Sequence, residues 1–151
     1  MQQSDYGVTF LGTAGARIMV ASQILASGGL WFDFGGTEIL LDPGPGTIVQ
    51  TARRKLKATK LKAIILSHKH LDHSGDVNVM IEAMTEGGFR PGGVLFAPRD
   101  ALDNDPVVLE IYLFVDQMLG LFKDLTLDFL ALAVKGLDPA GKRVCLSLIR
   151  A

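Results

Sequence analysis

The chain has 151 residues, of which 48% are hydrophobic and 21% are charged, and its formal net charge is −1. This length and composition favour a single domain over residues 1–151 with a real core, and they exclude a disordered chain. The small net charge gives no global attraction to nucleic acid or to a membrane surface. The start of the chain lacks the features of a signal peptide, and no apolar run reaches the roughly 18 residues of a membrane span.

Cys145 is the one cysteine of the chain, so an internal disulfide is excluded and a reducing, cytoplasmic location is favoured. No histidine is near Cys145 in sequence. We therefore expect its thiol to be buried rather than nucleophilic.

The first forty residues predict β-strands. Short apolar runs alternate with glycine pairs at positions 28–29 and 35–36, where tight turns need a positive φ. This part of the chain predicts a meander of about four strands, over residues 8–11, 17–25, 30–34 and 37–41.

The period of the pattern changes after Pro45, which suits the first turn of a helix. Val77, Met80, Ile81 and Met84 recur on one helical face, and Ser74 or Asp76 could cap that helix. The order of elements predicts an α/β (α+β) fold with helices packed on one face of a sheet. The expected elements are a helix over 47–56, a buried strand over 61–67, a helix over 74–85 and a strand over 94–97.

The last third of the chain, residues 101–151, is an apolar tail that we leave unassigned. Residues 106–122 have a helical pattern, 125–134 fit a helix or a strand, and 144–149 alternate as a strand does. No internal repeat and no domain linker is found.

All three histidines of the chain lie within six residues of one another, directly after the buried strand. His68 and His70 are two residues apart, so in an extended segment they project to the same side and can bind one ion together. Asp72 and His73 follow as the chain turns into the next helix, where they can reach a second position. Imidazole and carboxylate suit zinc, with manganese and iron as substitutes. A cluster of solvated loop histidines is the alternative, and we favour the metal site.

The pattern His-x-His-x-Asp-His after a strand resembles the metallo-β-lactamase superfamily. Two upstream motifs agree with it. Residues 10–15 (FLGTAG) resemble the opening of the phosphodiesterase and ribonuclease Z-like branches, and residues 40–44 (LLDPG) resemble a family strand that ends in an aspartate and a glycine turn. The resemblance covers residues 8–100, which correspond to the N-terminal half of the family fold.

The resemblance implies a metallo-β-lactamase-like αββα sandwich and a zinc hydrolase whose metal-activated water attacks its substrate. By resemblance, His68 and His70 hold the first metal and Asp72 and His73 the second. Asp72 also orients the attacking hydroxide, and Asp42 supports the metal loop without binding an ion. The first of the upstream motifs favours a phosphodiester or another ester over a β-lactam.

The family completes its two metal sites with ligands from the second half of the fold, and here no histidine follows His73. Each metal would then have two protein ligands, whereas open catalytic zinc sites have three. The alternative is therefore a catalytically incomplete or truncated half-fold that binds metal weakly or acts as an interaction module.

Half of a two-sheet sandwich leaves one sheet face bare, and we expect a large apolar patch there. The sequence leaves three explanations open. The apolar tail covers this face, or two chains pair through it as a homodimer, or the tail is a truncated or frame-shifted product that never packed.

A basic cluster precedes the strand that leads to the histidines. It could attract a small phosphate-bearing substrate or nucleic acid, although a solvated helix face is the interpretation we favour. No aromatic residue is interleaved for base stacking. The cluster consists of Arg53, Arg54, Lys55, Lys57, Lys60 and Lys62.

Overall fold

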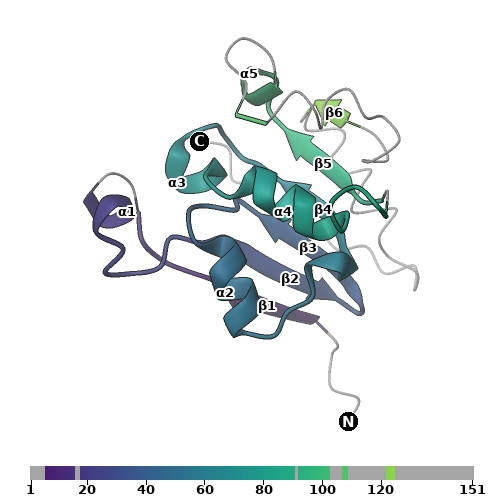
Figure 1. Ribbon diagram of the computed structural model, residues 1–151, viewed down its shortest axis with the longest axis horizontal. Coiled ribbons are helices and arrows are strands. Elements are labelled where there is room, and N and C mark those ends of the chain that lie inside the picture. The colour runs from purple at the N-terminus through teal and green to yellow at the C-terminus, as the bar shows by residue number, and fades with distance from the viewer. Residues whose placement is uncertain (1–5, 16–17, 91, 103–106, 109–121, 125–151) are drawn as a thin grey trace.

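The computed structural model describes residues 6–15, 18–90, 92–102, 107–108 and 122–124. These residues form a mixed α/β fold around one six-stranded sheet whose strand order follows the sequence, β1-β2-β3-β4-β5-β6 (Figure 1). The elements are β1 (Tyr6–Phe10), α1 (Ile18–Ser22), β2 (Leu30–Phe34), β3 (Thr37–Leu41), α2 (Thr47–Arg53), the 3-10 helix η1 (Ala58–Lys60), β4 (Leu61–Ile65), α3 (Leu71–Ser74), α4 (Val77–Met84), β5 (Val94–Ala97), α5 (Arg99–Leu102) and β6 (Phe122–Asp124).

The first three strands are antiparallel, as a meander requires. Between β2 and β3 the chain turns at Gly35 and Gly36, whose φ values are 64° and 91°. Two successive residues with positive φ make the tight turn that matches the twist of a hairpin. The side chain of Asp33 accepts a hydrogen bond from the Gly36 N–H at 2.7 Å and secures this turn. The predicted strands 30–34 and 37–41 are confirmed.

The other half of the sheet is parallel. β3, β4, β5 and β6 run in one direction, with α2 and η1 connecting β3 to β4 and α3 and α4 connecting β4 to β5. Parallel strands bring their carboxyl ends to the same edge of a sheet, where open α/β sheets place their ligands. The loops that follow Leu41 and Ile65 therefore meet at one edge.

Helices α2 and α4 cover one face of the sheet (Figure 1). Val77, Met80, Ile81 and Met84 of α4 pack against buried strand residues that include Trp31, Leu40, Ile64 and Leu95. These are the four α4 residues that the helical pattern places on one face. The prediction of helices on one face of the sheet is confirmed.

The opposite face of the sheet carries a second apolar cluster. Its buried members are Ile39, Ala63 and Phe96, and the partly buried Phe32, Phe34, Ile65 and Val94 pack around them. Three side chains of the edge strand β1 lie beside this cluster in register with β2, and each is more than half exposed: Tyr6 (55%), Val8 (51%) and Phe10 (59%). The expected bare face is therefore limited to the edge strand β1, because Ile39, Ala63 and Phe96 at the centre of the same face are buried.

The predicted strand over residues 17–25 is wrong, because from Ile18 the chain forms the short helix α1 instead. β1 pairs directly with β2, and Leu11 donates its N–H to Gly29 O at 3.0 Å, so no place for another strand remains between them. Gly12 lies so close to the carbonyl of Ala26 that a Cβ would collide with it. The segment between these contacts is a loop excursion from the sheet.

Most expectations for the tail lie outside the described residues. This holds for 125–134, for 144–149, for Cys145 and for most of the helix predicted over 106–122, whose last residue, Phe122, belongs to β6. Among the helices that are described, none is long and apolar enough to cross a membrane. The location of the protein stays a prediction.

Candidate metal centre

The centre begins with the contact between the ends of two parallel strands. Leu41 and Ile65 are partners in the β3–β4 register, which places Asp42 next to Ser67 although 25 residues separate them. The Asp42 carboxylate accepts a hydrogen bond from the Ser67 N–H at 2.6 Å through Oδ1, and another from the Ser67 hydroxyl at 2.7 Å through Oδ2. Asp42 thus holds the first residue of the histidine segment, which we define as residues 67–76.

The backbone of Asp42 has a φ of +52°, in the left-handed region that most side chains avoid. Aspartate is one of the few residues found there with some frequency. Such conformations cost free energy and persist where the surrounding structure stabilises them, often at functional sites. Here the two hydrogen bonds from Ser67 stabilise the left-handed conformation of Asp42.

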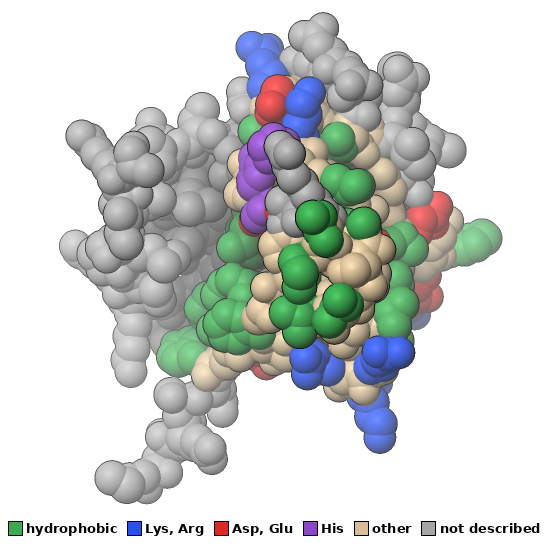
Figure 2. All heavy atoms as spheres, turned by 90° about the vertical axis from the view of Figure 1, so that its left-hand side faces the viewer, with side chains coloured by type: hydrophobic (Ala, Val, Ile, Leu, Met, Phe, Trp, Pro, Cys, Tyr) green, Lys and Arg blue, Asp and Glu red, His purple; other side chains and the backbone are tan. Residues whose placement is uncertain are grey.

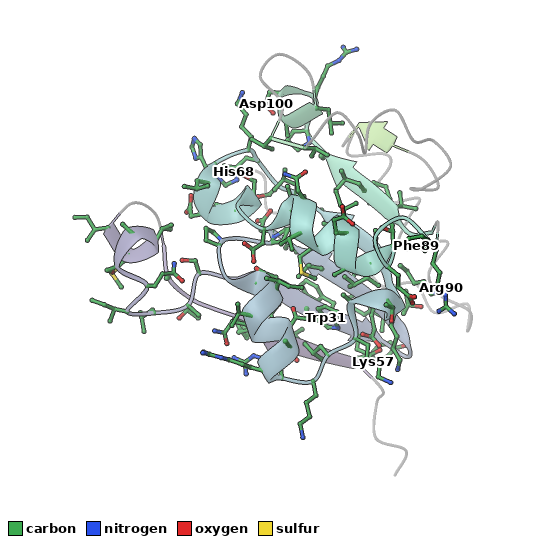
Figure 3. The ribbon with its side chains drawn as sticks, viewed as in Figure 1. Trp31, Lys57, His68, Phe89, Arg90 and Asp100 are labelled. Atoms are coloured by element: carbon green, nitrogen blue, oxygen red, sulfur yellow. The ribbon has the colours of Figure 1, made fainter. Side chains whose placement is uncertain are left out.

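The three imidazole rings lie together, with that of His68 in the middle. Its centroid is 4.7 Å from that of His70 and 4.0 Å from that of His73. Figure 3 shows His68 beside α3, at the edge of the sheet where β4 ends. The spacing of the rings permits neighbouring imidazoles to face a common ion.

The hydrogen bonds determine which nitrogen of His73 and of His68 is available. His73 Nδ1 lies 3.0 Å from Asp42 Oδ2, so it donates its proton to that carboxylate. The Ser67 hydroxyl already donates to Asp42, so it accepts the proton of His68 Nδ1, which is 2.9 Å away. In the tautomers with a protonated Nδ1, both rings present Nε2 as the nitrogen with a lone pair. A carboxylate or hydroxyl behind the ring is the usual support of a metal-binding histidine.

Asp72 lies beside the ring of His73. Its Oδ2 is 3.4 Å from His73 Nε2, and its side chain is only 15% exposed. A carboxylate oxygen and an imidazole nitrogen at this distance form a pair that one cation could join. Asp72 and His73 both belong to the short helix α3, which follows His70 directly.

The turn at residues 42–48 fixes the position of the histidine segment. Asp76 donates its N–H to Pro43 O at 2.8 Å, and its carboxylate accepts the Ile48 N–H at 2.9 Å. Gly44 lies so close to the carbonyl of Asp72 that a Cβ would collide with it, and a Cβ on Gly75 would come within 2.6 Å of the Pro45 ring. The turn at 42–48 and the histidine segment are thus interlocked.

The proposed caps of α4 need a correction. Asp76 occupies the N-cap position, but its carboxylate makes no capping hydrogen bond to α4 and reaches α2 instead. The hydroxyl of Ser74 donates to the carbonyls of Lys69 and His70 at 3.1 and 3.0 Å. Both side chains secure the path of the histidine segment rather than the start of α4.

Imidazole nitrogen and carboxylate oxygen are donors that suit a divalent cation, and the ring of His73, which Asp42 supports, lies beside the Asp72 carboxylate. In the described part of the chain, no three His, Cys, Asp or Glu side chains are placed to hold a single ion. Within the described residues, each candidate metal position therefore has two protein ligands at most.

The five site residues predicted from the sequence, Asp42, His68, His70, Asp72 and His73, all lie at this edge. Sequence reasoning missed the roles of Ser67 and Asp76. Ser67 could have been found as the polar residue between the buried strand and the first histidine. Nothing in the sequence pairs Asp76 with Ile48, which is 28 residues away.

Comparison with known proteins adds a family match. The family model described as the metallo-beta-lactamase superfamily matches residues 31–139. This match includes the whole histidine segment and continues past residue 100, where the recognisable motifs end.

Individual relatives are similar over part of their length. The chain is 34% identical over 96 residues to an uncharacterised protein of Methanocaldococcus jannaschii, a match that covers 64% of this chain and 36% of the relative. It is 30% identical over 94 residues to a ribonuclease Z of Kineococcus radiotolerans, which covers 62% and 29%. The crystal structure of the short form of human tRNase Z superposes with a TM-score of 0.54 at 27% identity, covering 64% of this chain and 35% of that one. The chain spans about a third of the length of these proteins.

Proposed function

Because this chain belongs to the metallo-beta-lactamase superfamily, we propose that it is a metal-dependent hydrolase with its active centre at the histidine segment. The observation that carries the proposal is the hydrogen-bond network of Asp42. It orients His73 directly and His68 through Ser67, and so leaves Nε2 of each ring for a metal ion. Hydrogen bonds that orient the rings in this way are typical of metal-binding histidines and are not expected for histidines of a solvated loop.

In this proposal His68 and His70 hold one ion, and Asp72 and His73 hold a second. Zinc suits these donors, and manganese or iron could replace it. A bound ion of this kind would supply an acidified water as the nucleophile. Asp72 would also orient that nucleophile, and Asp42 keeps His73 and Ser67 in place.

The proposed substrate is a phosphodiester, with another ester as the alternative within the same chemistry. The similarity to a ribonuclease Z and to human tRNase Z supports this choice, as does the FLGTAG opening at residues 10–15. The substrate could be a small molecule or a nucleic acid.

A second candidate function rests on the number of ligands. Within the described residues, each ion would have two protein ligands, fewer than the three of open catalytic zinc sites. In this alternative the chain is a catalytically incomplete half-fold that binds metal weakly or serves as an interaction module.

Metal content and hydrolysis of an aryl phosphodiester separate the two candidates. For the hydrolase we expect about two ions per chain after dialysis, and a loss of activity of at least about 100-fold in His68→Ala, because a ligand matters more than its supports. Lys69→Ala, which alters the neighbour of both histidines, is the matched control and should keep its activity. Full activity in His68→Ala would contradict the hydrolase, and a metal-free, inactive wild type would favour the incomplete half-fold.

A further inference from the structure

Each of the two proposed ion positions has one imidazole ligand that a hydrogen bond holds from behind. At the first position this ligand is His68, whose Nδ1 lies 2.9 Å from the Ser67 hydroxyl oxygen. At the second position it is His73, whose Nδ1 lies 3.0 Å from Asp42 Oδ2. Figure 2 shows the histidine side chains together at the surface, on one face of the molecule.

These two hydrogen bonds belong to one chain of hydrogen bonds that converges on a single oxygen atom. Asp42 Oδ2 accepts the Ser67 hydroxyl at 2.7 Å as well as the Nδ1–H of His73. A serine hydroxyl has one proton, and an ionised carboxylate can only accept. Because Ser67 donates its proton to Asp42, its oxygen accepts the Nδ1–H of His68. The hydrogen-bond chain therefore runs from His68 through Ser67 to Asp42, and from His73 to the same atom.

The place of the Ser67 hydroxyl is fixed by contacts that do not involve the histidines. The Ser67 N–H donates to the other oxygen of the same carboxylate, Asp42 Oδ1, at 2.6 Å. The parallel pairing of β3 with β4 extends to Leu41 and Ile65, shortly before these two residues. The side chain of Asp42 is only 18% exposed, so water competes little for its hydrogen bonds.

We infer that Ser67 is a positioning residue that couples the two ion positions, because its hydroxyl makes the tautomer of His68 depend on the carboxylate of Asp42. The hydrogen bond at one ring nitrogen determines which nitrogen is left for a metal ion, and Asp42 selects the same tautomer in His73 directly. A change at Asp42 therefore reaches both positions, whereas loss of the Ser67 hydroxyl reaches only the first. The inference rests on the proposed function for the role of the ions, but the coupling itself belongs to the metal-free chain.

Long-range proton–nitrogen correlation NMR of the whole metal-free chain tests the coupling, at a pH above the range in which histidine titrates. Such spectra distinguish the Nδ1–H from the Nε2–H tautomer of each ring, and we expect Nδ1–H for His68 and His73 in the wild type. Ser67→Ala should convert most of His68 to Nε2–H, the form that an imidazole favours in water, and leave His73 unchanged. Asp42→Asn should convert both rings, because an amide NH2 in place of Oδ2 donates where the carboxylate accepted.

Two variants and one ring serve as controls. Ser67→Thr keeps a hydroxyl and should keep His68 in the wild-type tautomer. Ser22→Ala removes the hydroxyl of an exposed serine of α1 and should change no ring. The ring of His70 contacts that of His68 at 4.7 Å but lies outside the hydrogen-bond chain, so its tautomer should be the same in all variants. A tautomer of His68 that neither Ser67→Ala nor Asp42→Asn alters would overturn the inference.

Isothermal titration calorimetry with zinc extends the test to the ions. Ser67→Ala should weaken one of the two binding steps about tenfold and leave the other unchanged, whereas Asp42→Asn should weaken both. Equal losses at both steps in Ser67→Ala would also overturn the inference. A wild type that has the expected tautomers but hydrolyses no aryl phosphodiester would count against the proposed function while leaving the coupling intact.

Discussion

Asp42 connects three parts of the candidate metal centre through one carboxylate. It accepts hydrogen bonds from the backbone and the hydroxyl of Ser67 and from the ring of His73. Its positive φ brings the carboxylate to these partners at the end of β3, at a cost in backbone strain. The residue therefore acts on the site through other residues rather than as a ligand.

The amide substitution Asp42→Asn tests this role. Asparagine tolerates the same φ and its oxygen can still accept the Ser67 N–H, but it removes the negative charge that orients His73. We expect zinc affinity to fall about 10- to 100-fold, as is typical for such supports. Competition with a chromophoric chelator measures the affinity.

Asp33→Asn is the matched control, since Asp33 also accepts a backbone N–H in the same sheet, in the hairpin turn between β2 and β3. It should leave zinc affinity unchanged. Equal losses in the two variants would mean that the effect of Asp42 is one of general stability.

The ligand candidates were predictable because they are close in sequence. His68, His70, Asp72 and His73 form one short pattern behind an apolar strand, and Asp42 ends another strand. The contacts of Ser67 and Asp76 were not predictable, because each joins segments more than twenty residues apart. Only the parallel pairing of β3 with β4 brings these segments together.

At the scale of elements, helix α4 joins the histidine segment to the sheet. It begins directly after Asp76, and its apolar face is buried on the strands. Val79 lies on the opposite side of the helix and is 40% exposed. Truncations on the buried and the exposed side of α4 can therefore be compared for their effect on the free energy of unfolding.

Truncation of Ile81 should destabilise the fold far more than truncation of Val79. Ile81 is fully buried, and Ile81→Ala should lower the free energy of unfolding by about 2–5 kcal/mol through lost contacts and a cavity. Val79→Ala should change it by less than about 1 kcal/mol. Urea denaturation followed by the fluorescence of Trp31 measures both, and similar losses would show that α4 is packed differently.

The elements that the sequence predicted well are those with a readable burial pattern. β2, β3 and β5 are apolar runs near glycine turns, and α4 has a four-residue apolar face. α1 has no buried residue, so it carries no periodic pattern from which a helix could be identified. The apolar run over residues 17–25 predicted a strand, but the direct pairing of β1 with β2 leaves no room for one.

At the scale of the whole molecule, the apolar side chains of β1 point to association. Tyr6, Val8 and Phe10 each keep more than half of their surface exposed in the single chain, next to the apolar cluster on that face. Exposed apolar surface that continues into a cluster is typical of an interface. A homodimer through β1 stays a prediction among the alternatives left open by the sequence, and it would involve the edge of the face only, since Ile39, Ala63 and Phe96 are already buried.

We expect sedimentation velocity to show a dimer whose population rises with protein concentration. Phe10→Lys should weaken the dimer, because it places a charge in the apolar face. Phe89→Lys is the control, since Phe89 is 90% exposed and belongs to the turn after α4. A monomer at every concentration would contradict this expectation and favour the tail as the cover of the face.

The close approach of Gly44 to the Asp72 carbonyl has a consequence for how the centre moves. A side chain at position 44 has no room, and Asp76 ties the same turn to α2 through Ile48. A displacement of Asp72 is therefore expected to be transmitted to the start of α2. Amide exchange at Ile48 and at Asp76 should accordingly slow in concert when zinc is added, as one cooperative unit.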